Sequence, residues 1–114
     1  MAGTGDTTAA VIGAGFAGAA HVEALRRVPG VRVAAISASS AASAAAAATR
    51  LGIERSTGDY RELVTDPGID VIHTCTPNDL HLEVNMAALE AGKHVLSEKP
   101  LGLDADETAR LVAA

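Results

Sequence analysis

The sequence predicts an α/β fold, a doubly wound parallel sheet with helices on both faces in three αβα layers. Three observations support this prediction. Short β-prone runs alternate with helical patterns, prolines and glycines separate them regularly, and 114 residues are enough for one domain but too few for two. Alternating strands and helices indicate βαβ units, whose crossovers are almost always right-handed, so a doubly wound sheet follows.

The first half of the chain contains two strand patterns, each followed by a helix pattern. A β-prone run over residues 7–12 stops at a glycine, and helical spacing of apolar residues over 17–28 ends at a Pro-Gly pair. A second strand is expected over 31–36. The segment 37–52 opens with serines suited to capping, continues with an alanine run that favours a helix, and ends at a glycine.

The next stretch carries weaker signals. Residues 53–58 are at best weakly β-prone. A short helix is expected over 59–65, because Asp59 and Glu62 have the spacing of a capping box. An Asp-Pro-Gly turn then leads into a clear strand over 69–75.

The last elements repeat the alternation. Helical spacing runs from 82 to a glycine at 92, and a fourth clear strand is expected over 94–98. Asp104 and Glu107 open a final helix that is still running at the last residue.

Composition excludes several classes of protein. Nine basic against fourteen acidic residues give a net charge of −5 without a basic cluster, and Phe16 and Tyr60 are the only aromatic residues, so we expect no nucleic-acid binding. The 25 alanines make up nearly half of the 48% apolar share, so the core must depend on Val, Ile and Leu. No apolar run reaches the roughly 20 residues of a membrane span, and no basic region precedes residues 9–20, so we expect a cytoplasmic protein.

Residues 13–18, GAGFAG, fit the G-x-G-x-x-G pattern between a predicted strand and a predicted helix. In this position Gly13 allows a tight turn, Gly15 lets the backbone approach a pyrophosphate, and Gly18 lets helix and strand pack closely. The N–H groups at the helix start and the helix dipole then hold the anion without a basic side chain. The alternative is that the glycines serve only the turn, but the strand–helix context favours a dinucleotide site.

The end of the second strand bears on the choice of dinucleotide. NAD-binding domains place an acidic residue there for the ribose 2′-hydroxyl, whereas this sequence has Ser37, Ser39 and Ser40, with Glu54 as the next acid. Without a carboxylate, nothing repels a 2′-phosphate, but the nearest arginine downstream, Arg50, lies at the far end of the helix. The sequence therefore permits NAD or NADP and slightly favours NADP.

Two later strand ends carry further polar groups, CTPNDLH over 75–81 and Glu-Lys-Pro over 98–100. Three motifs occur in this order along the chain: GAGFAG, CTPNDLH and AGKHVLSEKPLGLDADE. In their order and spacing the chain resembles, over essentially its whole length, the Gfo/Idh/MocA oxidoreductases. This family includes glucose-fructose oxidoreductase and inositol dehydrogenases. Glu-Lys-Pro after GKHV is the most specific part. The resemblance implies an NAD(P)-binding Rossmann domain over 1–114, and we expect residues 1–6 to form a disordered tail.

The resemblance also implies roles for individual residues. Thr76, Pro77 and Asn78 would border the nicotinamide and its ribose, and His81 would help to shape that wall. Lys99 would be catalytic, assisting proton transfer while hydride moves between a sugar or polyol carbon and the nicotinamide. The implied cofactor-binding residues are Gly13, Gly15, Phe16, Ala17, Ser37, Ser39, Ser40, Thr76, Pro77, Asn78, His81, Glu98, Lys99 and Pro100.

Simple chemistry agrees with such a role for Lys99, since an ammonium group stabilises the charge that hydride transfer leaves on a carbonyl oxygen. The alternative is a solvated surface lysine beside Glu98. Cys75 is expected to be small buried filler rather than a redox residue. The histidines, including His73 and His81, lack the spacing and partners of a metal site, so no metal is expected.

Family members also carry a C-terminal domain with an open antiparallel sheet, which supplies most substrate contacts and usually the oligomer interface. This domain is absent from the sequence, and the predicted sheet lacks its last strand. We therefore expect a piece of a longer, homo-oligomeric enzyme with a small sugar or polyol substrate, and no activity from the 114 residues alone. Two alternatives stay open: a non-catalytic dinucleotide-sensing module, and a relative that uses bound NAD transiently in glycoside hydrolysis or epimerisation.

Overall fold

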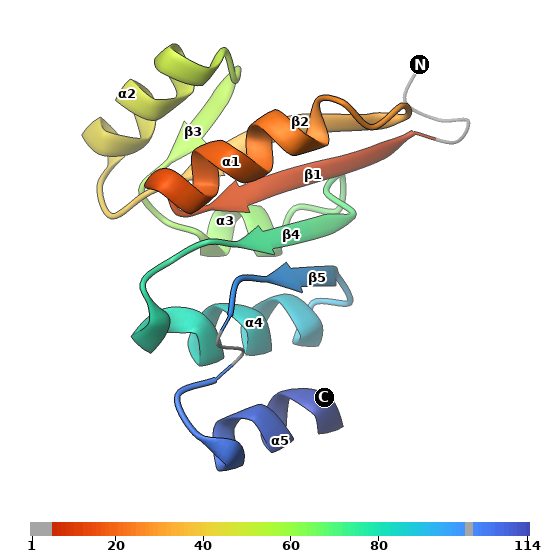
Figure 1. Cartoon of the computed structure of the whole chain (residues 1–114). Helices are drawn as coiled ribbons and strands as arrows, with labels where there is room; N and C mark the ends of the chain where they lie inside the picture. Colours follow the sequence, from red (N-terminus) through yellow and green to blue (C-terminus); the bar gives the residue numbers. More distant parts are fainter. Residues whose placement is uncertain (1–5, 100–101) are drawn as a thin grey trace.

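A computed structural model describes residues 6–99 and 102–114, and within them five strands form a single parallel sheet (Figure 1). The strand order is β3-β2-β1-β4-β5. The chain thus builds outward from β1 in one direction and then returns to build outward in the other, which confirms the doubly wound prediction. The strands are β1 (Thr7–Ile12), β2 (Val31–Ser37), β3 (Arg55–Thr57), β4 (Val71–Thr74) and β5 (His94–Ser97).

Helices cover both faces of this sheet. The described helices are α1 (Phe16–Leu25), α2 (Ala41–Leu51), α3 (Arg61–Val64), α4 (His81–Glu90) and α5 (Ala105–Ala113), with a 3-10 turn η1 (Asn78–Leu80) before α4. Helices α1 and α2 pack on one face, α3 and α4 pack on the other, and α5 lies against α4 (Figure 1). The three-layer αβα arrangement is therefore confirmed. Among the described residues, no helix is long and apolar enough to cross a bilayer.

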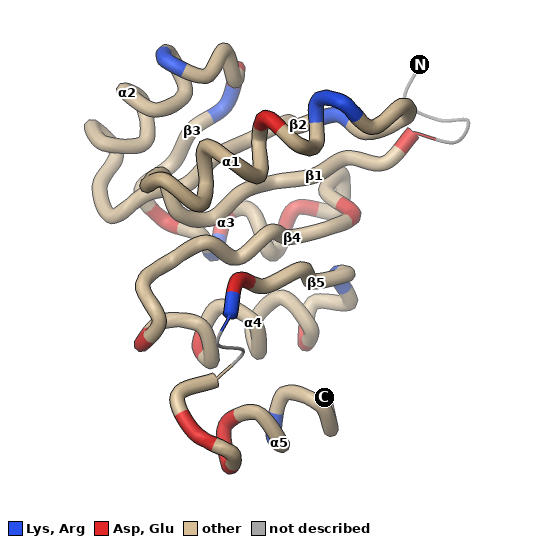
Figure 2. The backbone as a smooth tube through the Cα atoms, viewed as in Figure 1, with Lys and Arg blue, Asp and Glu red and all other residues tan. Residues whose placement is uncertain are grey.

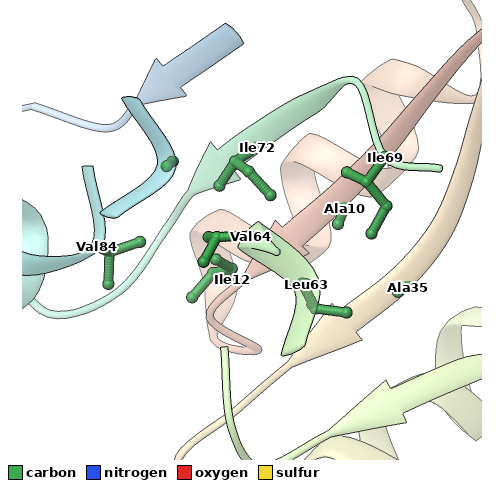
Figure 3. Packing of buried hydrophobic residues seen from close by; sticks show 9 residues of the cluster. Ala10, Ile12, Ala35, Leu63, Val64, Ile69, Ile72 and Val84 are labelled. Atoms are coloured by element: carbon green, nitrogen blue, oxygen red, sulfur yellow. The ribbon is translucent and has the colours of Figure 1, made fainter. Parts of the chain in front are cut away.

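Alternation along the central strands divides the core into two clusters. In β1, Ala10 and Ile12 face α3 and α4, whereas Val11 faces α1 and α2. Figure 3 shows the first cluster, in which Leu63 and Val64 of α3 pack over the sheet. The two clusters are composed of Ala10, Ile12, Ala35, Leu63, Val64, Ile69, Ile72, Val84 and Ala88, and of Val11, Val22, Ile36, Ala47, Ala48, Ile53 and Cys75.

The local signals placed several helix ends correctly. The Ser40 hydroxyl caps α2 by accepting from the N–H of Ser43, and Gly52 ends the helix at φ 69°. Asp104 caps α5 by accepting from the N–H of Glu107 at 2.9 Å. The alanine run of α2 turns Ala44, Ala47 and Ala48 inward, where their small side chains let the helix lie close to the sheet.

Two sequence expectations differ from the structure, and a third is not tested by it. The first helix ends at Leu25 rather than at 28. The N–H groups of Arg27 and Val28 form turn hydrogen bonds, and Val28, directly before Pro29, disfavours helical backbone. Within the segment 53–58, which carried only a weak signal, Arg55–Thr57 do form a strand, and it pairs with β2. The tail expected over 1–6 falls almost wholly on residues 1–5, which lie outside the described residues.

The capping box expected at Asp59 and Glu62 is wrong. The Asp59 carboxylate accepts from the N–H of Arg61 two residues on, at 3.0 Å. The Glu62 carboxylate instead accepts from the Thr57 hydroxyl, also at 3.0 Å. In a capping box, the Glu62 carboxylate would accept from the backbone N–H of Asp59. Thr57, at the end of β3, binds this carboxylate instead.

Candidate functional site

The turn after β1 is held between the carboxyl ends of two neighbouring strands. The N–H of Gly13 donates to the carbonyl of Ser37 at 2.9 Å, at the end of β2. Gly13 has φ +112°, and a Cβ built there would overlap the backbone carbonyl of Cys75 at the end of β4. Only glycine meets both the backbone angle and the close approach.

The other two glycines of the loop differ sharply from each other. A Cβ on Gly18 would overlap the carbonyl oxygen of Gly13, so Gly18 lets α1 pack tightly on the loop. A Cβ on Gly15 would meet nothing within 4 Å. Folding therefore requires Gly18 to be small, whereas Gly15 leaves open space in front of the first turn of α1.

The N-terminus of α1 points into this open space. Gly15 is the N-cap residue, no side chain caps the helix, and its first turn contains no acidic residue. The free N–H groups of a helix start and the positive end of its dipole form an anion site. Helix α1 itself contains no Lys or Arg, and Figure 2 shows the nearest basic segment beyond its other end, in the turn that leads to β2. The backbone would thus hold an anion without help from a basic side chain.

A cavity of about 490 Å³ adjoins the glycine loop at the carboxyl ends of β1, β2 and β4. This volume is within the usual range for small-molecule sites, and the place is where the strand order reverses. None of its lining side chains is acidic or basic. The lining residues are Ile12, Gly13, Ala14, Ser37, Ala38, Ser39, Ser43, Gly58, Tyr60, Cys75, Thr76, Pro77, Leu80 and Val84.

One side chain that lines this cavity carries a hydroxyl that makes no hydrogen bond to the described protein atoms. The Thr76 Oγ1 atom is buried and has no hydrogen-bond partner within the described part of the chain. Buried polar atoms in native proteins almost always have a partner. A dinucleotide supplies hydroxyl and phosphate groups, so both Thr76 and the open space at Gly15 fit such a ligand.

The serines after β2 take different positions. Ser37 is buried and lines the cavity together with Ser39, whereas Ser40 is occupied in capping α2. Sequence reasoning missed Ser43, one turn into α2, and Gly58, where a Cβ would lie 2.6 Å from the N atom of Ala41. A glycine directly after a strand pattern was the available signal for Gly58.

The segment after β4 forms the opposite wall of the cavity. Thr76 and Pro77 line it, and Asn78 is exposed in η1. His81 is fully buried, and its Nε2 lies 3.0 Å from the carbonyl oxygen of Thr76. His81 therefore braces the wall from behind rather than lining it.

Other candidates lie at the rim of the site. Phe16 is 91% exposed at the start of α1, and Ala17 packs against the second core cluster. Lys99 is exposed just beyond β5 and does not line the cavity, and Pro100 lies outside the described residues. The N–H of Glu98 donates to the carbonyl of Thr74 at 2.9 Å, which ties this strand end to the end of β4.

Two histidines join Glu98 in a hydrogen-bonded group that the sequence did not predict. The Nε2 atom of His21 lies 2.6 Å from Oε2 of Glu98, and its Nδ1 lies 3.0 Å from Nδ1 of His73. The hydrogen bond from His21 holds the pKa of the Glu98 carboxyl below its ordinary value. Burial, and then the nearby His21, lower the pKa of His73. In the described residues no cluster of three or more His, Cys, Asp or Glu suits a metal ion.

Cys75 is expected to be chemically inert in the folded protein. Its side chain is buried, and burial, with a smaller contribution from Glu98, raises the pKa of the thiol to about 12. Because the thiolate is the nucleophile, alkylation by iodoacetamide at pH 8 should be about 1,000-fold slower in the folded protein than in urea. Mass spectrometry of timed samples measures both rates. Equal rates would contradict this and restore a redox role.

The fold and the site together define a dinucleotide-binding domain. Residues 7–114 match the oxidoreductase family described as having an NAD-binding Rossmann fold. The chain belongs to this family, Gfo/Idh/MocA, as its motifs predicted.

Curated relatives and solved structures agree with this assignment. The chain is 40% identical to levoglucosan dehydrogenase of Pseudarthrobacter phenanthrenivorans, covering 91% of this chain and 29% of the relative. It is 36% identical to inositol 2-dehydrogenase/D-chiro-inositol 3-dehydrogenase of Lactiplantibacillus plantarum, covering 93% and 31%. A levoglucosan dehydrogenase structure in complex with NADH and L-sorbose superposes with a TM-score of 0.93 at 36% identity, covering 96% of this chain and 32% of that one. The chain thus spans about a third of the length of these proteins.

Proposed function

We propose that this chain is the nucleotide-binding part of an NAD(P)-dependent oxidoreductase that transfers hydride between nicotinamide and a sugar or polyol carbon. The observation that carries the proposal is the open space at Gly15, in a loop whose Gly13 and Ala14 line a cavity that extends to Thr76. The named activities of the relatives, on levoglucosan and on inositol, support the substrate class.

Each part of the cavity suits one part of a dinucleotide. The N–H groups at the start of α1 would hold the pyrophosphate, and Ser37 and Ser39 lie where the adenosine ribose would reach the end of β2. Thr76 and Pro77 would border the nicotinamide side. The bound cofactor would supply or accept the hydride.

Lys99 is the proposed catalytic residue. Its exposed position beyond β5 leaves the ammonium group accessible to a substrate at the carboxyl ends of the strands. A cation there would stabilise the negative charge that develops on a carbonyl or alcohol oxygen during hydride transfer.

The uncharged residues that line the cavity at the end of β2 are the basis for our proposal on NAD against NADP. Ser37, Ser39 and Ser43 line the cavity, and no lining residue carries a carboxylate that would repel a 2′-phosphate. Because no lining residue is basic either, we expect both cofactors to bind, with a slight preference for NADPH. The complete enzyme is proposed to be a cytoplasmic homo-oligomer whose further domain completes the small-molecule site.

Titration of the chain with NADH and NADPH tests the proposal. Enhancement of nicotinamide fluorescence, checked by calorimetry, should give saturable binding of both below millimolar concentration. Binding of neither at millimolar concentration would overturn the proposal.

Turnover in the complete enzyme separates catalysis from sensing. Lys99→Ala should lower kcat by about 100-fold or more while the Kd of NADH stays within about twofold of wild type. Arg110→Ala, an exposed change on α5, is the matched control. Unchanged turnover in Lys99→Ala would exclude Lys99 from catalysis. NAD(P)H consumption that is not stoichiometric with product would instead favour transient use of bound NAD.

A further inference from the structure

His21 connects the helix of the glycine loop to the strand end that carries Lys99. It lies on α1, six residues after Gly15, and its side chain is only 15% exposed. Its ring contacts Glu98, which is 77 residues away in sequence, at 2.6 Å. The contact therefore joins the first crossover of the sheet to its last strand.

The hydrogen-bond donors in this group follow from its chemistry. The pKa of Glu98 is lowered, so its carboxylate is ionised near neutral pH and can only accept, which requires a proton on Nε2 of His21. The 3.0 Å contact between the two Nδ1 atoms also requires one proton. A neutral His21 accepts there from the Nδ1–H of His73, and a protonated His21 donates to it. In both states Nε2–H faces Glu98, so His73 keeps His21 oriented as a donor.

Glu98 connects His21 to Lys99, the next residue in the chain. The backbone of Lys99 also helps to keep the pKa of the Glu98 carboxyl low, after the larger effect of His21. The N–H of Glu98 is bound to the carbonyl of Thr74 at 2.9 Å. The side chain of Glu98 is thus fixed to α1 and its backbone to the end of β4, directly before Lys99.

We propose that His21 is a positioning residue, which holds the Glu98 carboxylate and through it the backbone from which Lys99 reaches the substrate. This inference rests on the proposed function. Helix α1 would then have two roles. Its first turn would bind the pyrophosphate, and through His21 it would orient the Lys99 amine beyond the end of β5.

The test compares three single variants in the complete enzyme. His21→Ala removes the donor, whereas His21→Gln places an amide N–H near the position of Nε2. His94→Gln is the matched control, because His94 is exposed at the start of β5, outside this group. For each variant, the measured quantities are the Kd of NADH, kcat, KM and the Tm.

The expected result is a loss confined to kcat. His21→Ala should lower kcat by about 10- to 100-fold, as a small misplacement of a catalytic group does, with the Kd of NADH within about twofold of wild type. His21→Gln should recover kcat to within about threefold. Should His21→Ala not fold, Glu98→Gln, which keeps the shape but loses the charge, takes its place.

The pH profile distinguishes positioning from a merely structural role. His21 lowers the pKa of Glu98, so its removal lets the carboxylate protonate at higher pH, and the acid limb of kcat should move to higher pH in His21→Ala. The other titratable groups near Glu98 are His73, Cys75, His81 and Lys99, which all three variants retain.

Two results would overturn the inference. One is wild-type kcat in His21→Ala, and the other is a lowered Tm with an unmoved acid limb and no recovery in His21→Gln. Failure of the wild-type protein to bind NADH is a different result, because it would overturn the proposed function instead.

Discussion

Replacing Gly15 by valine is expected to weaken NADH binding about 100-fold or more while changing the free energy of unfolding by less than about 1 kcal/mol. A Cβ at Gly15 meets no protein atom within 4 Å, and the backbone angles φ −81° and ψ −158° suit any residue. The branched side chain would instead fill the space in front of the N–H groups of α1, where the pyrophosphate must approach.

Fluorescence titration with NADH and urea unfolding measure the two effects in the same samples. Ala24→Val is the matched control, since it places the same side chain at an exposed position of α1 away from the loop. Near-wild-type affinity in a folded Gly15→Val protein would show that the cofactor does not bind at the start of α1.

Replacing Gly13 by alanine is expected to destabilise the fold itself, by about 3 kcal/mol or more. The new Cβ would overlap the carbonyl of Cys75, which is backbone at the end of β4 and cannot rotate away. The φ of +112° adds a conformational cost of its own. A domain with only about 5–15 kcal/mol of stability would lose a large part of it.

Gly92→Ala separates the two contributions. Gly92 also has a positive φ, 81°, but a Cβ there would meet nothing within 4 Å. We therefore expect it to cost only the conformational part, about 1–2 kcal/mol. Urea unfolding compares the two variants, and an equal loss in both would show that the approach of Gly13 to β4 has no energetic importance.

Features of the fold that depend on neighbours in sequence were predictable. The strand and helix patterns, the caps at Ser40 and Asp104, and the helix stop at Gly52 each need only a few adjacent residues. A prediction was wrong where a residue from another element binds the group concerned. Glu62 was expected to complete a capping box, but the Thr57 hydroxyl at the end of β3 binds its carboxylate.

The candidate site likewise has features that the sequence predicts and features that depend on other elements. The glycine pattern predicted the turn, its close packing and the open side of the loop, because these are steric requirements of a strand–turn–helix unit. The glycine pattern gave no sign of Ser43, Gly58 or Tyr60, which line the cavity only because β3 and α2 pack against β2, the strand next to β1. The contact of His21 with Glu98 could not be predicted, since nothing near His21 in the sequence indicates Glu98.

The sequence alone determined the α/β class, the order of its elements and the nucleotide-binding loop, since periodicity, caps and glycines act over a single turn or strand. The tertiary structure decided which groups meet. Parallel strands bring their carboxyl ends to one edge of the sheet, so Gly13 meets Cys75. The packing of α1 on the sheet brings His21 to Glu98, which is 77 residues away in the sequence. Such meetings depend on crossovers and on the close packing of whole layers, which a local pattern does not specify.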